Sequence, residues 1–130
     1  MEYKEILYFM PFSGGPLGEG DSCLVLKLTP KSADAVADAL QHNKDINKFP
    51  MDSEISEYTY SNMYIESASY HMSELKNGFY GFYSKFTDKI LPYQQLLKTV
   101  TTGEDIYLLN SYWYIQYDVE EEILYIWEYG

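Results

Sequence analysis

The N-terminal part of the chain alternates apolar runs with a helix-like pattern. Residues 2–10 and 22–28 are rich in Tyr, Ile, Leu, Val and Phe, which is typical of strands. The glycine-rich residues 13–21 between them predict an open loop. Thr29 and Pro30 then suit the N-cap and first position of a helix. Apolar residues follow at spacings of three and four: Ala33, Val36, Ala37 and Leu40. This pattern predicts strand, loop, strand and a short helix ending near Asn43.

The middle of the chain gives a weaker pattern. Residues 42–56 mix polar and isolated apolar positions and predict a surface connection. Residues 57–70 are strand-like, either as a hairpin that turns at Ser61-Asn62 or as one uninterrupted strand. Residues 79–86 follow the turn signal Asn77-Gly78, and their aromatic spacing fits a strand or a helix. Residues 93–100 predict a short helix, with Pro92 in its first turn and Gly103 closing it.

The C-terminal part predicts strands at 106–109, 112–117 and 123–129, with an acidic turn at 118–121. No internal repeat or linker interrupts the chain. The whole pattern predicts one globular domain over residues 1–130, of the α+β class. Its expected architecture is an antiparallel sheet with two or three short helices packed on one face.

The acidic turn also predicts which residues share a face of the last hairpin. An even-length turn at 118–121 places Trp113 opposite Ile126 and Tyr112 opposite Trp127. One face then carries Trp113, Ile115, Leu124 and Ile126 and is expected in the core. The other carries Tyr112, Tyr114, Gln116, Ile123, Tyr125 and Trp127, residue types that tolerate partial exposure. The predicted partner-binding residues are Tyr112, Tyr114, Gln116, Glu120, Glu121, Glu122, Tyr125, Trp127 and Glu128.

The competing interpretation is that strand aromatics pack in the core and acidic clusters form solvated turns, which is the commoner outcome for any single tyrosine. Charge segregation favours binding. Residues 99–130 contain seven carboxylates and neither Lys nor Arg. Residues 51–75 contain five carboxylates and also lack both Lys and Arg. If the two acidic stretches lie side by side, they form one acidic face.

Composition narrows the class of partner. The 130 residues include 9 basic and 20 acidic side chains, for a net charge of −11, and all the basic residues are lysines. Such a charge argues against direct contact with nucleic acid or an anionic membrane and favours a basic protein partner. The 18% aromatic content is too high for a disordered acidic tail. A single cysteine and the absence of a signal-peptide pattern predict a cytoplasmic protein.

No catalytic, cofactor or metal pattern stands out. The glycine-rich loop lacks the Gly-Lys-Ser/Thr ending of a phosphate loop and precedes a strand instead of a helix. His42 and His71 lack partners at zinc-ligand spacing, and residues 118–122 lack the pattern of a calcium loop. Cys23 is expected to be a buried thiol, although a nucleophile pair with His71 across the fold is an alternative. The sequence predicts no cofactor, no metal and no enzymatic activity.

Size, acidity and aromatic content together predict a small protein-binding inhibitor that blocks a basic functional surface. Bacterial immunity proteins against toxins share this physical character, and a toxin nuclease requires a basic cleft that an acidic protein can cover. One alternative is a nucleic-acid mimic that inhibits a DNA- or RNA-binding protein. Another is a small-ligand or carbohydrate-binding domain with an aromatic pocket.

Overall fold

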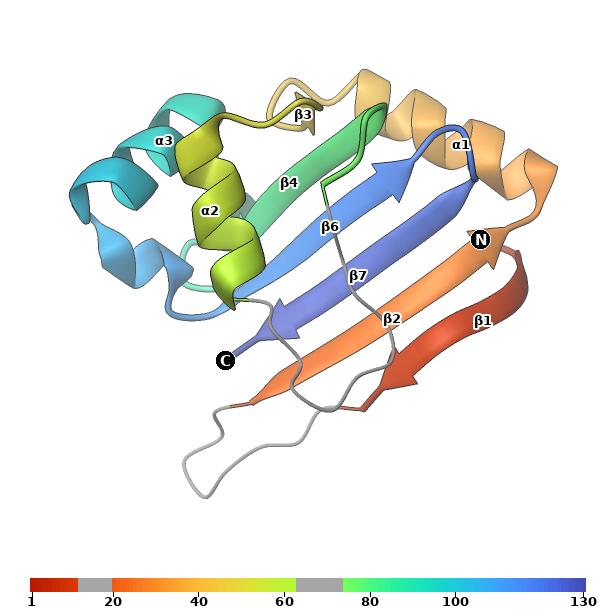
Figure 1. Ribbon diagram of the computed structural model, residues 1–130, viewed down its shortest axis with the longest axis horizontal. Helices are drawn as coiled ribbons and strands as arrows, with labels where there is room; N and C mark the ends of the chain where they lie inside the picture. Colours follow the sequence, from red (N-terminus) through yellow and green to blue (C-terminus); the bar gives the residue numbers. More distant parts are fainter. Residues whose placement is uncertain (12–19, 63–73) are drawn as a thin grey trace.

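The computed structural model describes residues 1–11, 20–62 and 74–130. Within them, seven strands form one antiparallel sheet, in the order β1-β2-β7-β6-β4-β3, with β5 paired to β4 (Figure 1). The strands are β1 (Tyr3–Met10), β2 (Asp21–Leu28), β3 (Asn47–Lys48), β4 (Gly78–Ser84), β5 (Lys89–Ile90), β6 (Tyr112–Asp118) and β7 (Ile123–Tyr129). The helices are α1 (Pro30–Gln41), α2 (Ser53–Asn62), α3 (Tyr93–Thr102) and the 3₁₀ helix η1 (Ile106–Leu109).

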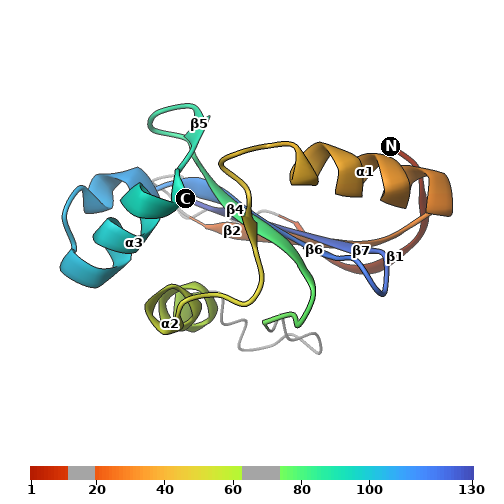
Figure 2. The same cartoon turned by 90° about the horizontal axis from the view of Figure 1, so that it is seen from above.

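The α+β class and the antiparallel sheet are confirmed, but the helices do not share one face as expected. Figure 2 shows α1 and α2 on opposite sides of the sheet. α1 packs its apolar stripe on Leu26, Leu28 and Phe79, whereas Ile55 of α2 and Leu96 of α3 pack with Tyr80 and Phe82. We call these two sides the α1 face and the α2/α3 face. Covering both faces lets this short chain bury apolar surface on each side of its sheet.

The strands and helices with strong local signals form where the sequence predicts them. β1 and β2 coincide with the two N-terminal apolar runs, and β4 settles the open choice at residues 79–86 in favour of a strand. Thr29 caps α1 by accepting a hydrogen bond from the Ser32 N–H at 3.3 Å. At the end of α3, Gly103 takes a left-handed conformation with φ of 77° and donates its N–H to the Thr99 carbonyl.

The strand predicted at residues 57–70 is wrong for its described part, because residues 57–62 belong to α2. Ile55 and Thr59 are buried one helical turn apart, and this packing overrides the strand preference of the local tyrosines. Glu74 stabilises the start of α2, since its carboxylate accepts hydrogen bonds from the Met51 N–H at 2.9 Å and the Ser56 hydroxyl at 3.0 Å. The remainder of the predicted segment, including His71, lies outside the described residues.

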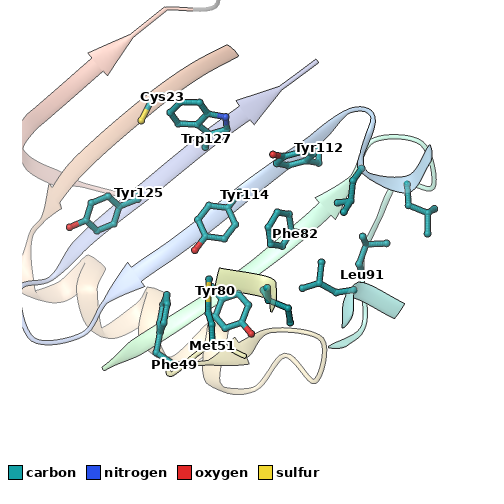
Figure 3. Close-up of a cluster of buried hydrophobic side chains, with 14 of the residues drawn as sticks. Cys23, Phe49, Met51, Tyr80, Phe82, Leu91, Tyr112, Tyr114, Tyr125 and Trp127 are labelled. Carbon is teal, nitrogen blue, oxygen red and sulfur yellow. The ribbon is translucent and has the colours of Figure 1, made fainter. Parts of the chain in front are cut away.

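Two further predictions also change. Residues 106–109 form the 3₁₀ helix η1 instead of a strand, because Leu108 and Leu109 are both buried and alternation along a strand cannot place neighbours on one side. The expected surface connection at 42–56 contains the short strand β3 and the start of α2. It also buries Phe49 and Met51, each 8% exposed, in the core of the α2/α3 face (Figure 3).

Candidate functional site

The predicted contact face of the β6–β7 hairpin is part of the core. Tyr112, Tyr114, Gln116 and Trp127 are each 1% exposed or less, and Tyr125 is 8% exposed. Figure 3 shows the aromatic side chains among them gathered in the core cluster of the α2/α3 face. The expectation that this face is partly exposed is therefore wrong, and as the chain is folded these five side chains are not presented to a partner.

The grouping of residues into faces was nevertheless predicted correctly. Trp113 pairs with Glu128 and Tyr112 with Tyr129, so the register differs by two residues from the one expected. The turn spans residues 119–122 and remains even in length, which preserves which side chains share a face. The error concerned the side that the helices cover. Trp113, Ile115 and Ile126, which were expected in the core, lie on the α1 face and are only partly buried.

A polar network explains how tyrosines and a glutamine are accommodated in the core. The Gln116 side-chain oxygen accepts hydrogen bonds from the Tyr114 hydroxyl at 2.7 Å and the Tyr60 hydroxyl at 2.8 Å. Burial raises the pKa of Tyr114 well above its ordinary value, which keeps this hydroxyl protonated and able to donate. The side chains of Tyr60, Tyr114 and Gln116 therefore hydrogen-bond one another away from solvent. On the same face, the Tyr112 hydroxyl and Trp127 Nε1 are buried without a hydrogen-bond partner among the described residues.

The acidic residues predicted at the same site have different surroundings. Glu120 and Glu121 are exposed at the turn, where the Asp118 carboxylate accepts hydrogen bonds from their backbone N–H groups at 3.0 Å each. Glu128 instead forms an ion pair with Lys85 and accepts a hydrogen bond from the Ser22 hydroxyl at 3.2 Å.

Lysines outside the lysine-free C-terminal stretch also reach it. Lys27 donates to the Glu121 carbonyl, and Lys98 forms ion pairs with Glu104 at 3.1 Å and Asp105 at 3.9 Å. The folded surface is therefore less segregated in charge than the sequence indicates. Glu120, Glu121 and Glu122 remain the most concentrated acidic group of the predicted site.

A cleft of about 720 Å³ lies where the β4–β5 hairpin meets the start of α3 and η1. These elements lie at the end of the molecule opposite the N-terminus (Figure 2). Its lining combines acidic, aromatic and amide side chains with a few apolar ones. The lining residues are Asn43, Asp45, Tyr83, Thr87, Asp88, Lys89, Ile90, Leu91, Pro92, Gln95, Asp105, Tyr107 and Leu108. A cavity of this size and mixed chemistry is typical of a binding site.

The charges lining the cleft are mainly negative. Asp45, Asp88 and Asp105 contribute carboxylates, and Lys89 is the one basic residue of this lining. Asp105 shares Lys98 with Glu104, while Asp45 and Asp88 form no ion pair with any part of the chain that the structure describes. Over the same residues, no group of three His, Cys, Asp or Glu side chains lies close enough to hold a metal ion.

Large exposed apolar residues border the cleft. Phe86 is 70% exposed and Tyr107 is 43% exposed, and their rings meet edge to face with centroids 4.8 Å apart. Ile106 beside them is 46% exposed. Neighbouring exposed aromatics of this kind mark interaction surfaces more often than isolated ones do.

The cleft continues into an apolar part of the α1 face. Tyr83 and Ile90 line both the cleft and a smaller cavity of about 200 Å³, which is also lined by Ile46, Gly81, Trp113 and Ile115. The absence of a side chain at Gly81 leaves room for the Ile46 side chain, because a Cβ at Gly81 would lie 2.7 Å from Ile46 Cδ1. A cross-strand row of residues then runs from this cavity to the sheet edge: Gly81, Ile115, Ile126, Leu24 and the 60% exposed Phe9.

No spacing of residues along the chain indicated this cleft. Its walls come from residues 43–45, 83–95 and 105–108, which only the fold brings together. The high aromatic content indicated binding, but the exposed pair Phe86 and Tyr107 was not distinguished from the buried tyrosines of β6 and β7.

The surroundings of Cys23 do not favour the alternative that this thiol is a nucleophile. The thiol is buried, and burial raises its pKa to about 12, the reverse of the shift that activates a cysteine. His42, at the C-cap of α1, contacts Asp38 of that helix at 3.3 Å on an exposed surface.

No protein-family model, curated protein or solved structure matches this chain. Among the described residues, none of the helices is long and apolar enough to cross a membrane. The chemistry of the cleft and its surroundings therefore carries the functional argument.

Proposed function

We propose that this protein is a small acidic inhibitor that covers a basic functional surface of another protein, as an immunity protein does for a toxin. The observation that carries the proposal is the pairing of exposed Phe86 and Tyr107 with a cleft whose charged lining is mainly carboxylate. Aromatic side chains provide contact area at low entropic cost, and carboxylates select a basic partner.

The net charge of −11 supports the same partner class. An acidic protein attracts a basic one over about a Debye length, which is roughly 8 Å at physiological salt, and this attraction raises the association rate. A toxin that cleaves nucleic acid presents a basic cleft of the required charge. A nucleic-acid-binding protein blocked by this chain as a mimic would differ only in the identity of the partner.

The test is affinity capture from the lysate of the native host with an N-terminally tagged protein, at low and moderate salt. We expect a basic protein to bind and to elute as salt increases. A Phe86→Ala/Tyr107→Ala variant should lose this partner, with the dissociation rate rising about tenfold or more. The control is Phe9→Ala, which removes a 60% exposed aromatic side chain outside the cleft. Equal capture by all three proteins would exclude the cleft as the contact site.

The carboxylates of the β6–β7 turn give a second, separable readout. Replacing Glu120, Glu121 and Glu122 with Lys should mainly slow association, by roughly tenfold at low salt, because rim charges act on encounter more than on the bound state. An unchanged association rate in the folded variant would remove this turn from the steering surface.

The second candidate function is binding of a small neutral ligand such as a carbohydrate in the same cleft. Tyr83, Tyr107, Asn43 and Gln95 supply the stacking and hydrogen-bonding groups that such ligands require. Binding of a neutral ligand is insensitive to salt, whereas association with a basic protein weakens as salt increases. Specific salt-insensitive binding of a saccharide, with no protein captured at either salt concentration, would favour this second function.

A further inference from the structure

We infer that the cleft accepts an arginine side chain of the partner and that this side chain is the central contact of the complex. This inference rests on the proposed function and specifies the chemistry of its contact site. It is carried by three features of the cleft: its volume, its uncompensated carboxylates and its aromatic residues.

The excess of carboxylates in the cleft favours a cationic ligand. Asp45 and Asp88 have no cationic partner among the described residues, and Asp105 has a distant one, at 3.9 Å, which it shares with Glu104. Lys89 alone does not balance three carboxylates. A guanidinium bound in the cleft can form charge-assisted hydrogen bonds with these carboxylates.

The aromatic residues favour a flat cation. Tyr83 and Tyr107 line the cleft, and Phe86 contacts Tyr107 at its border. Guanidinium groups stack on aromatic faces more readily than ammonium groups do. Outside the cleft, the chain itself makes a cation–π contact of the ammonium kind, with Lys85 Nζ 5.0 Å from the centroid of the Trp113 ring.

The placement of the carboxylates favours arginine over lysine. The three aspartates come from separate segments and are too dispersed to hold a metal ion together. A guanidinium has five N–H donors in a planar fork and can reach acceptors on more than one side, whereas an ammonium acts as a compact point charge. A volume of about 720 Å³ accommodates the whole side chain and part of its backbone.

The test is a titration of the isotopically labelled protein followed by amide chemical shifts. The probes are N-acetyl-arginine amide, N-acetyl-lysine amide and the neutral isostere N-acetyl-citrulline amide. We expect saturable shifts at the residues of the cleft with arginine, with citrulline binding roughly tenfold or more weakly and lysine between them. Equal binding of arginine and citrulline, or arginine shifts located elsewhere, would overturn the inference.

Matched variants locate the effect. Asp88→Asn removes one carboxylate of the cleft, and asparagine tolerates the left-handed backbone that Asp88 adopts at φ of 59°. Asp34→Asn makes the same chemical change at an exposed position of α1 outside the cleft. We expect arginine affinity to fall about threefold to tenfold in the first variant and to stay unchanged in the second. Equal affinities in both would contradict the inference.

The two proposals fail separately. If the capture experiment yields a basic partner that depends on Phe86 and Tyr107 but the arginine probe does not bind, the inference is wrong and the proposed function stands. If the probe binds in the cleft but no protein is captured, the arginine contact belongs to a different function. Lack of both results rejects both proposals.

Discussion

The two faces of the sheet differ in composition and in how completely they are covered. On the α2/α3 face, Tyr112, Tyr114 and Trp127 are almost fully buried in one core cluster with Ile55 of α2 and Leu96 of α3. On the α1 face, Trp113 and Ile115 remain partly exposed because α1 packs around the other end of the strands, at Leu26 and Leu28. The more polar aromatic face is therefore covered more completely, and the more aliphatic face is fully buried only where α1 packs on it.

This difference shows that the composition of a strand face does not decide which side becomes buried. Tyrosine is compatible with a core when its hydroxyl finds a partner, as Tyr60 and Tyr114 do on Gln116. Isoleucine on the other face remains accessible when no helix covers it. The arrangement of the helices, which single-strand patterns do not contain, decides the outcome.

The largest effect that would test this contrast is loss of the fold in alkali. Burial raises the pKa of Tyr80 to about 12, and it raises the pKa values of Tyr112 and Tyr114 as well, above the ordinary tyrosine value of about 10. The folded state thus holds protons that the unfolded state releases above about pH 10, so the free energy of unfolding falls as pH rises from about 10 through 12. Denaturant unfolding at increasing pH should show this fall. Ionisation of all tyrosines at ordinary pKa with the fold intact would contradict the buried face.

The next effect compares the two tryptophans. Trp127→Ala should reduce the free energy of unfolding by about 3–5 kcal/mol, because a large side chain that is 1% exposed leaves a cavity. Trp113→Ala should cost roughly 1 kcal/mol, since its side chain is partly exposed. Urea denaturation of both variants measures the difference. Similar losses would show that the two faces contribute equally to the core.

A smaller effect isolates the polar network of the α2/α3 face. Gln116→Met keeps the size of the side chain but leaves the hydroxyls of Tyr60 and Tyr114 without their shared acceptor. We expect a loss of about 1–3 kcal/mol in unfolding free energy. Combining it with Tyr60→Phe should recover part of this loss, because one orphaned hydroxyl is then absent. An additive double variant would argue against the network.

The smallest effect belongs to the open part of the α1 face. Phe9 is 60% exposed at the edge of the sheet, so Phe9→Ser should change the free energy of unfolding by less than about 0.5 kcal/mol. Thermal and urea unfolding compared with the parent protein provide the measurement. A loss as large as that of a core substitution would show that this position is covered in solution.

Local signals in the sequence predicted most of the fold. The apolar runs at β1, β2, β6 and β7, the Thr29 cap and the left-handed Gly103 depend on neighbours in the chain, and these elements form as expected. The failures at residues 57–62 and 106–109 occur where long-range packing overrides local preference.

The candidate site was less predictable because its key relations are tertiary. The ion pair of Glu128 with Lys85 joins residues from separate charge regions of the sequence. Phe86 and Tyr107 meet only after the β4–β5 hairpin and η1 are placed. A pattern along the chain reports which residues are available for binding, whereas their exposure and proximity follow from the packing of the whole domain.

The position of β7 between β2 and β6 has a consequence for how the chain reaches this fold. Ser22 and Glu128, which meet across β2 and β7, are separated by 106 positions in the sequence. Closing so long a loop has an entropic cost before any contact offsets it, so folding is expected to be slow for a domain of this size. Until β7 inserts, β2 presents an unpaired apolar edge, which makes this interval the one in which the chain is most exposed to aggregation.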